Sequence, residues 1–327
     1  MPGLYFDQRW CAQHGIGRFA TETRKHLVGW NDLPINGYPT NATDAWRLGR
    51  CLRREKATLF FSPGFNVPAF AKCRVVCTIH DLIHVHYRDK QSKLKLAYYK
   101  HLQRPVVRRS PLTLTVSEFS RQQIIQWYGL RDSQVVCVGN GVSDEFTPDG
   151  PRLDTDQRFL LYVGNTRPHK NVDVLLRALS RIDSDLSLTM VMKPNDSIRR
   201  RIQQLGLAQR VRFRTGLSDA ELAMHYRAAV ATVLPSYFEG FGLPLVEAMA
   251  CGCPVMGADR TSIPEVMGSA GLLFDPDDEE SLVEQITRIE SPSSDRQSKV
   301  ALGLRQASRF RWADVAYRID NALKNVA

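Results

Sequence analysis

Several features are missing from this 327-residue chain, and each absence excludes a class of protein. No apolar stretch approaches the roughly 20 residues that a membrane-spanning helix needs. The first ten residues, MPGLYFDQRW, contain an Asp and an Arg, so we expect no secretory signal there. The sequence has no low-complexity tract and no internal repeat of the kind that builds a solenoid. We therefore expect a cytoplasmic globular protein.

The cysteines are also too irregular to form a cross-linked framework. There are seven, an odd number, and no two of them form a CxxC pair. A disulfide scaffold or a zinc ribbon needs regular pairs. We expect reduced thiols, mostly buried in strands and at helix ends.

Charge is distributed unevenly along the chain. Residues 1–150 hold 21 Lys and Arg against 12 Asp and Glu, a net +9, whereas residues 151–327 hold 23 against 22, a net +1. This asymmetry indicates an anionic partner for the first half, either a membrane surface or a nucleic acid. Nucleic-acid binding is the alternative from another functional class. It is disfavoured because no recognised module is present and the aromatic residues are not interleaved with the basic ones.

Short β-branched runs alternate with segments of helical period, which predicts parallel sheets with crossover helices. The expected strands are 3–6, 58–62, 74–79, 112–116, 134–138, 159–164, 187–192, 211–214, 230–234, 254–257 and 271–274. The expected helices are 16–30, 43–55, 92–109, 118–128, 171–182, 196–205, 218–228, 243–250, 279–290 and 299–325. This is too many strands for one sheet, so we predict an α/β protein of two doubly wound units. The polar segment 144–157 is the natural linker between them.

A pair of glycines opens the first expected helix. Residues 14–20, HGIGRFA, superficially fit the GxGxxA fingerprint of dinucleotide-binding enzymes. That fingerprint follows a strand directly, whereas eight residues separate Phe6 from Gly15, and no acidic residue ends a second strand at the expected distance. A nicotinamide-dependent dehydrogenase is therefore disfavoured. Gly15 and Gly17 can still leave backbone N–H groups available to a phosphate.

A second loop with a possible phosphate-binding role is 164–171, GNTRPHKN, which follows the apolar run 159–163. Arg167 and Lys170 lie in this loop, where a strand gives way to a helix. Cations at the carboxyl end of a strand can neutralise phosphate, because open α/β sheets bind their ligands there. The alternative is an ordinary solvated basic loop.

The segment 235–250, PSYFEGFGLPLVEAMA, contains the most informative pattern. Its second proline suits the first turn of a helix, so Glu239 lies in the preceding loop and Glu247 about one turn inside the helix. Gly240 and Gly242 let the backbone approach a ligand closely. Both carboxylates can then address one ligand at the helix N-terminus. A capping Glu239 with a surface Glu247 would leave the glycines unexplained.

Together these segments resemble the large retaining GT-B glycosyltransferase family, glycosyltransferase family 4. The E-x7-E spacing of Glu239 and Glu247 within EGFGLPLVEAMACGCPV looks like the family signature. The resemblance covers nearly the whole chain. It includes GIGRF at 15–19, CTIHD at 77–81, TVSEFS at 115–120, GNGV at 139–142, YVGNTRPHKN at 162–171, FRTGLSDAEL at 213–222 and TSIPEV at 261–266.

The resemblance implies a GT-B fold, in which two Rossmann-like domains face each other across a cleft. Residues 1–150 would form the N-terminal, acceptor-side domain, and the C-terminal helix 306–327 would pack back on it. Residues 151–305 would form the C-terminal domain that binds the nucleotide sugar.

The resemblance also implies roles for individual residues. Catalytic roles fall to Glu239 beside the donor sugar, to His80 near the reaction centre and to Lys170 on the diphosphate, while Glu247 would bind the nucleotide ribose. The donor-binding set is Gly15, Gly17, Arg167, Lys170, Leu217, Gly240, Phe241, Gly242, Leu243 and Glu247. His80 has a second interpretation as a structural histidine. The chain departs from the family at Asn165, where an Arg is usual, and Arg167 is expected to take over that function.

We expect the reaction to need no metal and no cofactor. Departure of a nucleoside diphosphate develops negative charge, which Lys170, Arg167 and backbone amides at a helix N-terminus can stabilise. The DxD pattern of metal-dependent transferases occurs three times, at Asp154–Asp156, Asp183–Asp185 and Asp275–Asp277. All three pairs lie in polar loops away from the glycine segments, so we interpret them as solvent-facing.

The resemblance implies a retaining hexosyltransferase, and its details favour a mannosyltransferase. The GNxxPHKN form of the second loop and the TIHDL run look most like bacterial polysaccharide and lipopolysaccharide mannosyltransferases. The implied donor is GDP-mannose, with a UDP-sugar or another GDP-sugar as the alternative. The implied acceptor is a saccharide or a lipid-linked saccharide used in cell-surface polysaccharide synthesis.

The segment 90–109 carries seven basic residues and no acidic one. Leu94, Ala97, Tyr98 and Leu102 recur between them at helical spacing. One interpretation is a crossover helix that packs on its own sheet. The other is a basic face that rests on anionic lipid, which would make the protein peripheral to the inner face of the cell membrane.

Overall fold

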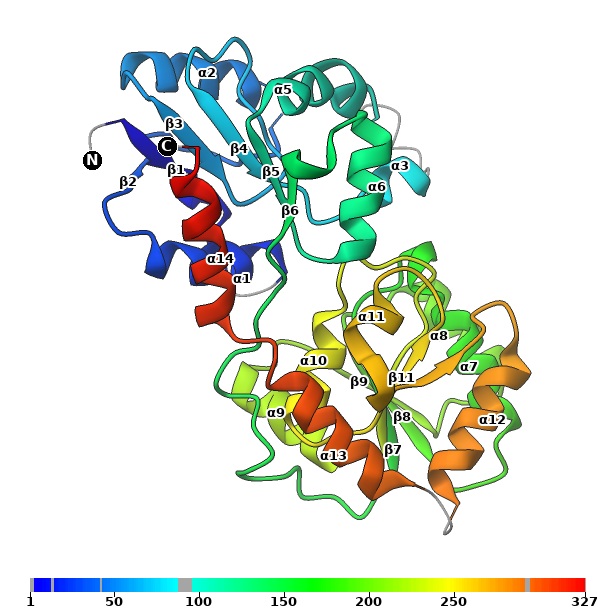
Figure 1. Ribbon diagram of the computed structural model, residues 1–327. Coiled ribbons are helices and arrows are strands. Elements are labelled where there is room, and N and C mark those ends of the chain that lie inside the picture. Colours follow the sequence, from blue (N-terminus) through cyan, green and yellow to red (C-terminus); the bar gives the residue numbers. More distant parts are fainter. Residues whose placement is uncertain (1–2, 13–14, 42, 88–95, 292–294, 327) are drawn as a thin grey trace. The chain divides into compact units, whose positions relative to one another are not determined.

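The computed structural model describes residues 3–12, 15–41, 43–87, 96–291 and 295–326. The chain divides into two compact units, one formed by Met1–Gly141 with Arg311–Ala327 and the other by Val142–Phe310. Each unit contains a six-stranded, entirely parallel sheet with helices around it (Figure 1). The predicted α/β class with two doubly wound sheets is confirmed.

The first sheet has the strand order β2-β1-β3-β4-β5-β6. Its strands are β1 (Leu4–Phe6), β2 (Asn31–Asp32), β3 (Leu59–Ser62), β4 (Arg74–Thr78), β5 (Leu112–Thr115) and β6 (Val135–Cys137). Every residue of β3 and β5 is buried, because helices cover both faces of the sheet. In the register, Phe6 lies opposite Phe61, which in turn lies opposite Val76.

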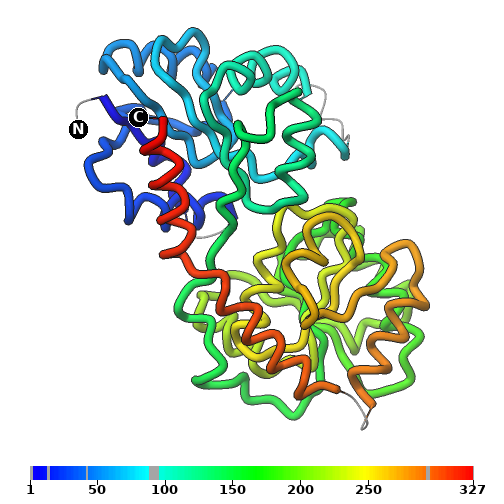
Figure 2. Tube along the Cα trace, in the orientation of Figure 1, coloured from blue at the N-terminus to red at the C-terminus, as the bar shows by residue number. Residues whose placement is uncertain are grey.

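Helices of the first unit lie on both the N-terminal and the C-terminal part of the chain. They are α1 (Ile16–His26), α2 (Asp44–Arg54), α3 (Ile83–His86), a π-helical stretch (Tyr98–Gln103), α5 (Arg104–Arg109), α6 (Glu118–Tyr128) and α14 (Trp312–Lys324). In α6, the Ser117 hydroxyl caps the N-terminus and the left-handed Gly129 ends the helix. Although α14 is the last helix of the chain, it packs on α1, as the red and blue traces show (Figure 2).

The second sheet has the order β12-β11-β10-β7-β8-β9. Its strands are β7 (Phe159–Val163), β8 (Ser187–Val191), β9 (Val211–Arg214), β10 (Ala231–Leu234), β11 (Val255–Ala258) and β12 (Leu272–Phe274). Its helices are α7 (Val172–Arg181), α8 (Asp196–Gln204), α9 (Asp219–Ala228), α10 (Leu243–Ala250), α11 (Ile263–Met267), α12 (Glu279–Glu290) and α13 (Arg296–Ala307). Helix α10 packs on α9 and α13, and α7 packs on α12.

Every expected strand overlaps an observed one, and the differences have local causes. Strand β2 escaped prediction because its two residues are polar and exposed. The C-terminal helical period, expected to be continuous over 299–325, is interrupted between α13 and α14. Val142 donates its backbone N–H to the Phe310 carbonyl at 2.9 Å, and Arg311 is extended. The terminal helix, expected at 306–327, therefore begins at Trp312.

The segment expected to link the units, 144–157, is bound to the second one. The Arg227 guanidinium of α9 donates to the backbone carbonyls of Pro151 at 2.8 Å and of Thr147 at 3.0 Å. Phe146, just upstream, is buried with its ring 5.9 Å from that of Tyr226. Polar composition indicated a loop here, but only these contacts show to which unit the loop belongs.

None of the seven cysteines, all of which lie within the described residues, forms a disulfide bond. Four of them, Cys51, Cys77, Cys251 and Cys253, are buried, and burial raises the pKa of Cys253 to about 11. Buried thiols with a raised pKa are poor nucleophiles. The expectation that the thiols are mostly buried is confirmed. In the part of the chain that the structure covers, no helix is long and apolar enough to span a membrane.

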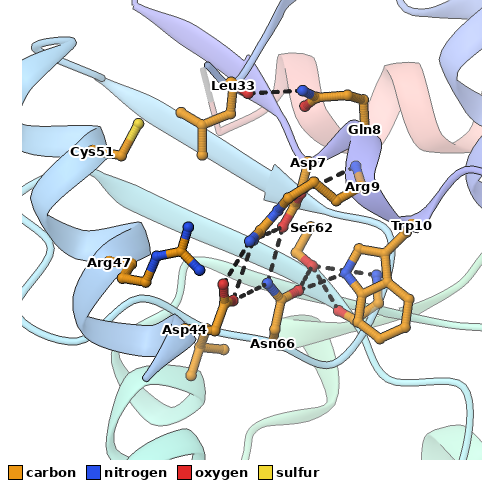
Figure 3. A network of polar contacts seen from close by, with 12 residues as sticks. Asp7, Gln8, Arg9, Trp10, Leu33, Asp44, Arg47, Cys51, Ser62 and Asn66 are labelled. Atoms are coloured by element: carbon orange, nitrogen blue, oxygen red, sulfur yellow. Dashed lines mark hydrogen bonds and ion pairs between the residues drawn. The ribbon is translucent and has the colours of Figure 1, made fainter. Parts of the chain in front are cut away.

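A buried polar network joins the carboxyl ends of β1 and β3 (Figure 3). Arg9 is paired with Asp7 at 2.7 Å and with Asp44 at 2.5 Å, and all three side chains are at most 5% exposed. The Asn66 amide donates to both carboxylates, at 2.9 and 3.2 Å, and its oxygen accepts from the Trp10 indole at 2.7 Å. Two carboxylates around one guanidinium make Arg9 indispensable to the network.

Replacement of Arg9 tests this conclusion. Arg9→Met should lower the free energy of unfolding by about 3–5 kcal/mol, because it leaves two buried carboxylates without a cation. Asp44→Asn should cost only about 1–2 kcal/mol, because Asp7 still neutralises Arg9. Urea unfolding of the full chain measures both values. Equal losses in the two variants would contradict the proposed balance of charge.

Candidate active site

The candidate site in the second unit lies where β7 and β10 end. These strands are neighbours in the sheet and run parallel. Their carboxyl ends therefore open at the same edge, the edge at which α/β sheets bind ligands. The loop 164–171 leaves β7, and the loop 235–242 leaves β10 and leads into α10. The two loops are tied together, because Tyr237 donates its backbone N–H to the His169 carbonyl at 2.8 Å.

Lys170 and Glu239 form an ion pair across these two loops. The distance from Lys170 Nζ to Glu239 Oε1 is 2.6 Å, and the side chains are 16% and 13% exposed. The short 3₁₀ helix Pro168–Lys170 carries the lysine to this position. Two of the three predicted catalytic residues are thus in direct contact. The pair keeps an ammonium group at the carboxyl edge of the sheet, where it can meet an anion.

Hydrogen bonds to the hydroxyl groups of Thr261 and Ser262 hold the loop that carries Glu239. Thr261 Oγ1 accepts from the Glu239 backbone N–H at 3.1 Å. Ser262 Oγ lies within hydrogen-bonding distance of two carbonyl oxygens, that of Glu239 at 3.0 Å and that of Phe241 at 3.1 Å. The Phe241 ring is buried edge-on to Phe310 at 5.5 Å. These contacts hold the backbone through Gly240 in one conformation.

Helix α10 starts where this loop ends. Gly242 is the N-cap residue and has φ 103°, a left-handed conformation that glycine adopts without strain. Leu243 is the first helical residue, and Pro244 follows it. No side chain caps this N-terminus. The first turn of a helix presents backbone N–H groups and the positive end of the helix dipole, both of which favour an anionic ligand.

Glu247 lies one turn further along α10 and has a different partner. Its side chain is buried, and its Oε2 accepts a hydrogen bond from the Tyr226 hydroxyl at 2.9 Å. The two signature glutamates are therefore held separately, Glu239 by a lysine and Glu247 by a tyrosine. This separation fits two different functions.

The departure at Asn165 has a structural consequence in the loop after β7. The Asn165 side-chain oxygen accepts from the Arg167 backbone N–H at 3.0 Å, and its carbonyl accepts from Tyr162 Oη at 2.6 Å. A side chain at Gly164 would meet that same Tyr162 hydroxyl at 2.6 Å. Arg167 is exposed in this loop.

Leu217, another residue of the predicted donor-binding set, is half-buried in the turn between β9 and α9, immediately before the Ser218 cap.

His80, in the first unit, follows β4 and is held as a neutral imidazole. Its Nε2 lies 2.9 Å from the Pro63 carbonyl, which can only accept, so Nε2 carries the proton. Burial lowers the pKa of His80 to about 4. The ring packs edge-on to Phe19 of α1 at 4.9 Å. With Nε2 as the donor, Nδ1 is the acceptor atom of this histidine.

The two glycines at the start of α1 have different structural requirements. Gly15 is the N-cap residue, with φ 58°, and a side chain there would meet nothing within 4 Å. A Cβ at Gly17 would instead lie 2.4 Å from Cβ of Ala12. Gly17 is therefore required by packing, a reason that the sequence did not reveal. Gly15 leaves open space above the helix start.

No group of three or more potential metal ligands occurs within the described residues. In one of the DxD segments, both Asp275 and Asp277 are ion-paired with Arg260 at 3.1 Å. In another, Asp185 is paired with Arg158 at 3.3 Å. These carboxylates serve as partners of surface arginines.

Three residues that support the site are not marked by any pattern in the sequence. Tyr226 holds Glu247, and Thr261 and Ser262 hold the loop around Glu239. Tyr226 lies within the expected helix 218–228, and no pattern in the sequence marks it as the partner of Glu247. TSIPEV was recognised as part of the resemblance, but nothing in it specified what its hydroxyl groups contact.

Two family models together match almost the whole chain. The model described as Glycosyltransferase Family 4 matches residues 6–146, and the one described as Glycosyl transferases group 1 matches residues 143–301. Among curated proteins, the chain is 31% identical over 294 residues to O-antigen chain mannosyltransferase B of Escherichia coli, covering 85% of this chain and 77% of that protein. It is also 31% identical over 216 residues to O-antigen chain mannosyltransferase RfbU of Salmonella typhimurium, covering 65% and 60%. It spans only 33% of the serotype-specific mannosyltransferase WbdA of Escherichia coli.

Solved structures agree on the fold. Sucrose-phosphate synthase from Thermosynechococcus elongatus has a TM-score of 0.78 at 18% identity, with 99% of this chain and 98% of that chain covered. The Anabaena protein HepE, solved with UDP and glucose, has a TM-score of 0.75 at 18% identity and covers 99% of both chains. With two parallel six-stranded sheets and both family models matched in order, this chain belongs to the family 4 glycosyltransferases of GT-B fold.

Proposed function

We propose that this glycosyltransferase is a retaining mannosyltransferase that uses GDP-mannose. Its acceptor is a saccharide or lipid-linked saccharide in the synthesis of bacterial cell-surface polysaccharide or lipopolysaccharide. The observation that carries the proposal is the 31% identity, over 85% of the chain, to an O-antigen chain mannosyltransferase. A UDP-sugar or another GDP-sugar is the alternative donor.

The chemistry assigned to the second unit is stabilisation of the leaving group. When the bond between the anomeric carbon and the diphosphate breaks, its electron pair goes to the β-phosphate oxygen. The acceptor hydroxyl oxygen forms the new bond to that carbon, and the hydroxyl proton is taken up by the released diphosphate. Lys170, Arg167 and the amides of Gly240 to Leu243 supply fixed positive charge and dipoles for that oxygen. Glu239, paired with Lys170 at 2.6 Å, orients the ammonium group. No step in this scheme requires a metal or a cofactor.

Binding of the nucleoside is assigned to two other positions in the same unit. The buried Glu247 carboxylate accepts hydrogen bonds from the ribose, and the backbone near Leu217 holds the base. In the first unit, Gly15 and Gly17 are assigned to the diphosphate and His80 to the donor sugar. Because His80 is neutral above a pKa of about 4, its Nδ1 serves as an acceptor for a sugar hydroxyl and not as an acid.

Association with anionic lipid is a further part of the proposal, and it is purely electrostatic. Lys90, Lys93, Leu94 and Lys95 lie outside the described residues. Tyr98 and Leu102 pack against the core of the first unit, and the Val67 backbone N–H donates to Tyr98 Oη at 3.0 Å. The apolar stripe of this segment is thus used inside the protein. Lys100, Arg108 and Arg109 are exposed and available to lipid headgroups.

A mass-spectrometric screen of nucleotide sugars tests the function. Incubation with GDP-mannose should release GDP and mannose slowly without an acceptor, whereas UDP-glucose and UDP-galactose should remain intact. The same hydrolysis should persist in excess EDTA, because Lys170 and Arg167 supply the positive charge. Hydrolysis of a UDP-sugar alone would overturn the donor assignment. Complete loss in EDTA with rescue by Mg²⁺ or Mn²⁺ would overturn the assigned charge stabilisation.

The two glutamates should give different kinetic defects. Glu247→Ala should weaken GDP binding about 10- to 100-fold, the value of a lost hydrogen bond to a charged group, with little change in kcat. A ribose contact is equally strong in the ground and transition states. Glu239→Ala should also lower kcat, because it releases Lys170. Calorimetry with GDP and steady-state hydrolysis separate the two effects, and the exposed Glu284→Ala is the control. If Glu239→Ala changed only the affinity, its catalytic assignment would be wrong.

Vesicle sedimentation tests the lipid surface. The protein should sediment with vesicles containing phosphatidylglycerol at low salt and should be released at high salt, since each basic residue near the surface contributes about 1 kcal/mol. The triple variant Lys100→Glu, Arg108→Glu, Arg109→Glu should bind much more weakly. The matched control replaces three exposed basic residues of the second unit, Lys193, Arg200 and Arg212, by Glu. Equal binding to neutral and anionic vesicles would exclude this mechanism.

A further inference from the structure

Tyr226 lies outside the family signature and contacts one of its two glutamates, Glu247, directly. It lies on α9, is completely buried, and donates its hydroxyl hydrogen to Glu247 Oε2 at 2.9 Å. Helices α9 and α10 pack against each other, so the bond joins two neighbouring helices. Glu247 is itself only 6% exposed. A carboxylate in such surroundings needs hydrogen-bond donors to remain ionised.

The Tyr226 ring is also held by an aromatic contact. Phe146 packs edge-on to it, with the ring centroids 5.9 Å apart. The next residue, Arg227, anchors the same stretch of chain, because its guanidinium donates to the Thr147 and Pro151 carbonyls at 3.0 and 2.8 Å. The segment around Phe146 and the helix α9 are thus fastened together. These contacts restrict the ring to one position, so the hydroxyl has a fixed direction.

In this pair Tyr226 is the hydrogen-bond donor and Glu247 is the acceptor. Burial, and next the nearby Glu247 carboxylate, raise the pKa of Tyr226 well above its usual value. The phenol therefore keeps its proton throughout the neutral pH range. A carboxylate that accepts one directional hydrogen bond loses rotational freedom about its last side-chain bond. The orientation of the Glu247 carboxylate is then set before any ligand arrives.

We propose that Tyr226 is a positioning residue for nucleotide recognition. It holds the Glu247 carboxylate in the plane from which that group accepts hydrogen bonds from the ribose hydroxyls of a nucleoside diphosphate. This inference rests on the function proposed above for Glu247. Tyr226 acts through Glu247 alone and contacts neither the sugar nor the phosphate. Its contribution is pre-organisation, which strengthens binding by removing the cost of ordering the carboxylate.

The effect of removing the Tyr226 hydroxyl on nucleotide affinity should depend on whether the ribose hydroxyls are present. Tyr226→Phe keeps the buried ring and its packing but removes the hydroxyl. It should weaken GDP binding about 5- to 10-fold, the range expected for one hydrogen bond in a buried site, and leave kcat for GDP-mannose hydrolysis nearly unchanged. With 2′,3′-dideoxy-GDP, which has no ribose hydroxyl for Glu247 to bind, the same substitution should have no effect.

Calorimetric titration of four proteins with GDP and with 2′,3′-dideoxy-GDP tests this expectation. The proteins are the wild type, Tyr226→Phe, Glu247→Ala and the control Tyr128→Phe, which removes a buried hydroxyl bonded to Gln103 in the first unit. Selective loss of GDP affinity in Tyr226→Phe, with the control unchanged, supports the inference. An equal loss for both nucleotides would reduce Tyr226 to a packing residue, and no loss for GDP would exclude any positioning effect. If Glu247→Ala did not distinguish the two nucleotides, the ribose assignment of Glu247 would itself be wrong.

Discussion

The parallel direction of the strands is the constraint on which the rest of the structure depends. In each sheet, every strand pairs in parallel with its neighbours, so all the strands deliver the chain to the same edge. Residues that are distant in sequence then become neighbours. Lys170 and Glu239 are 69 positions apart, yet they form a 2.6 Å ion pair because β7 and β10 lie side by side. In the first unit, the Pro63 carbonyl after β3 meets the His80 ring after β4 for the same reason.

Buried charge at these edges is always compensated, and the way it is compensated decides what the groups can do. Arg9 neutralises Asp7 and Asp44 in a closed network, so these groups stabilise the fold. Lys170 and Glu239 retain some exposure, which leaves the pair accessible to a substrate. Glu247 accepts a hydrogen bond from the buried Tyr226 hydroxyl, which fixes the carboxylate on one side. His80 is half-buried, lies beside a carbonyl and stays neutral.

The likeness to solved glycosyltransferases at 18% identity shows how few residues the fold itself requires. Fully buried strands such as β3 and β10 need only apolar side chains of suitable size, and many sequences supply them. The loops are more demanding. Gly242 must adopt a left-handed conformation, and Gly17 must lie against Ala12 without a side chain.

The sequence by itself determined the α/β class, the two doubly wound sheets, nearly all strands and helices, and the loops that carry Lys170, Glu239 and His80. Hydrophobic periodicity and glycine spacing are local properties, so they can be read without a structure. Only the tertiary structure decided which residues are partners. Tyr226 and Glu247 are 21 positions apart and meet because α9 packs on α10, and the segment after Val142 joins the second unit because Arg227 binds its carbonyls. Hydrogen bonds between distant elements depend on packing geometry, which no local pattern of residues encodes.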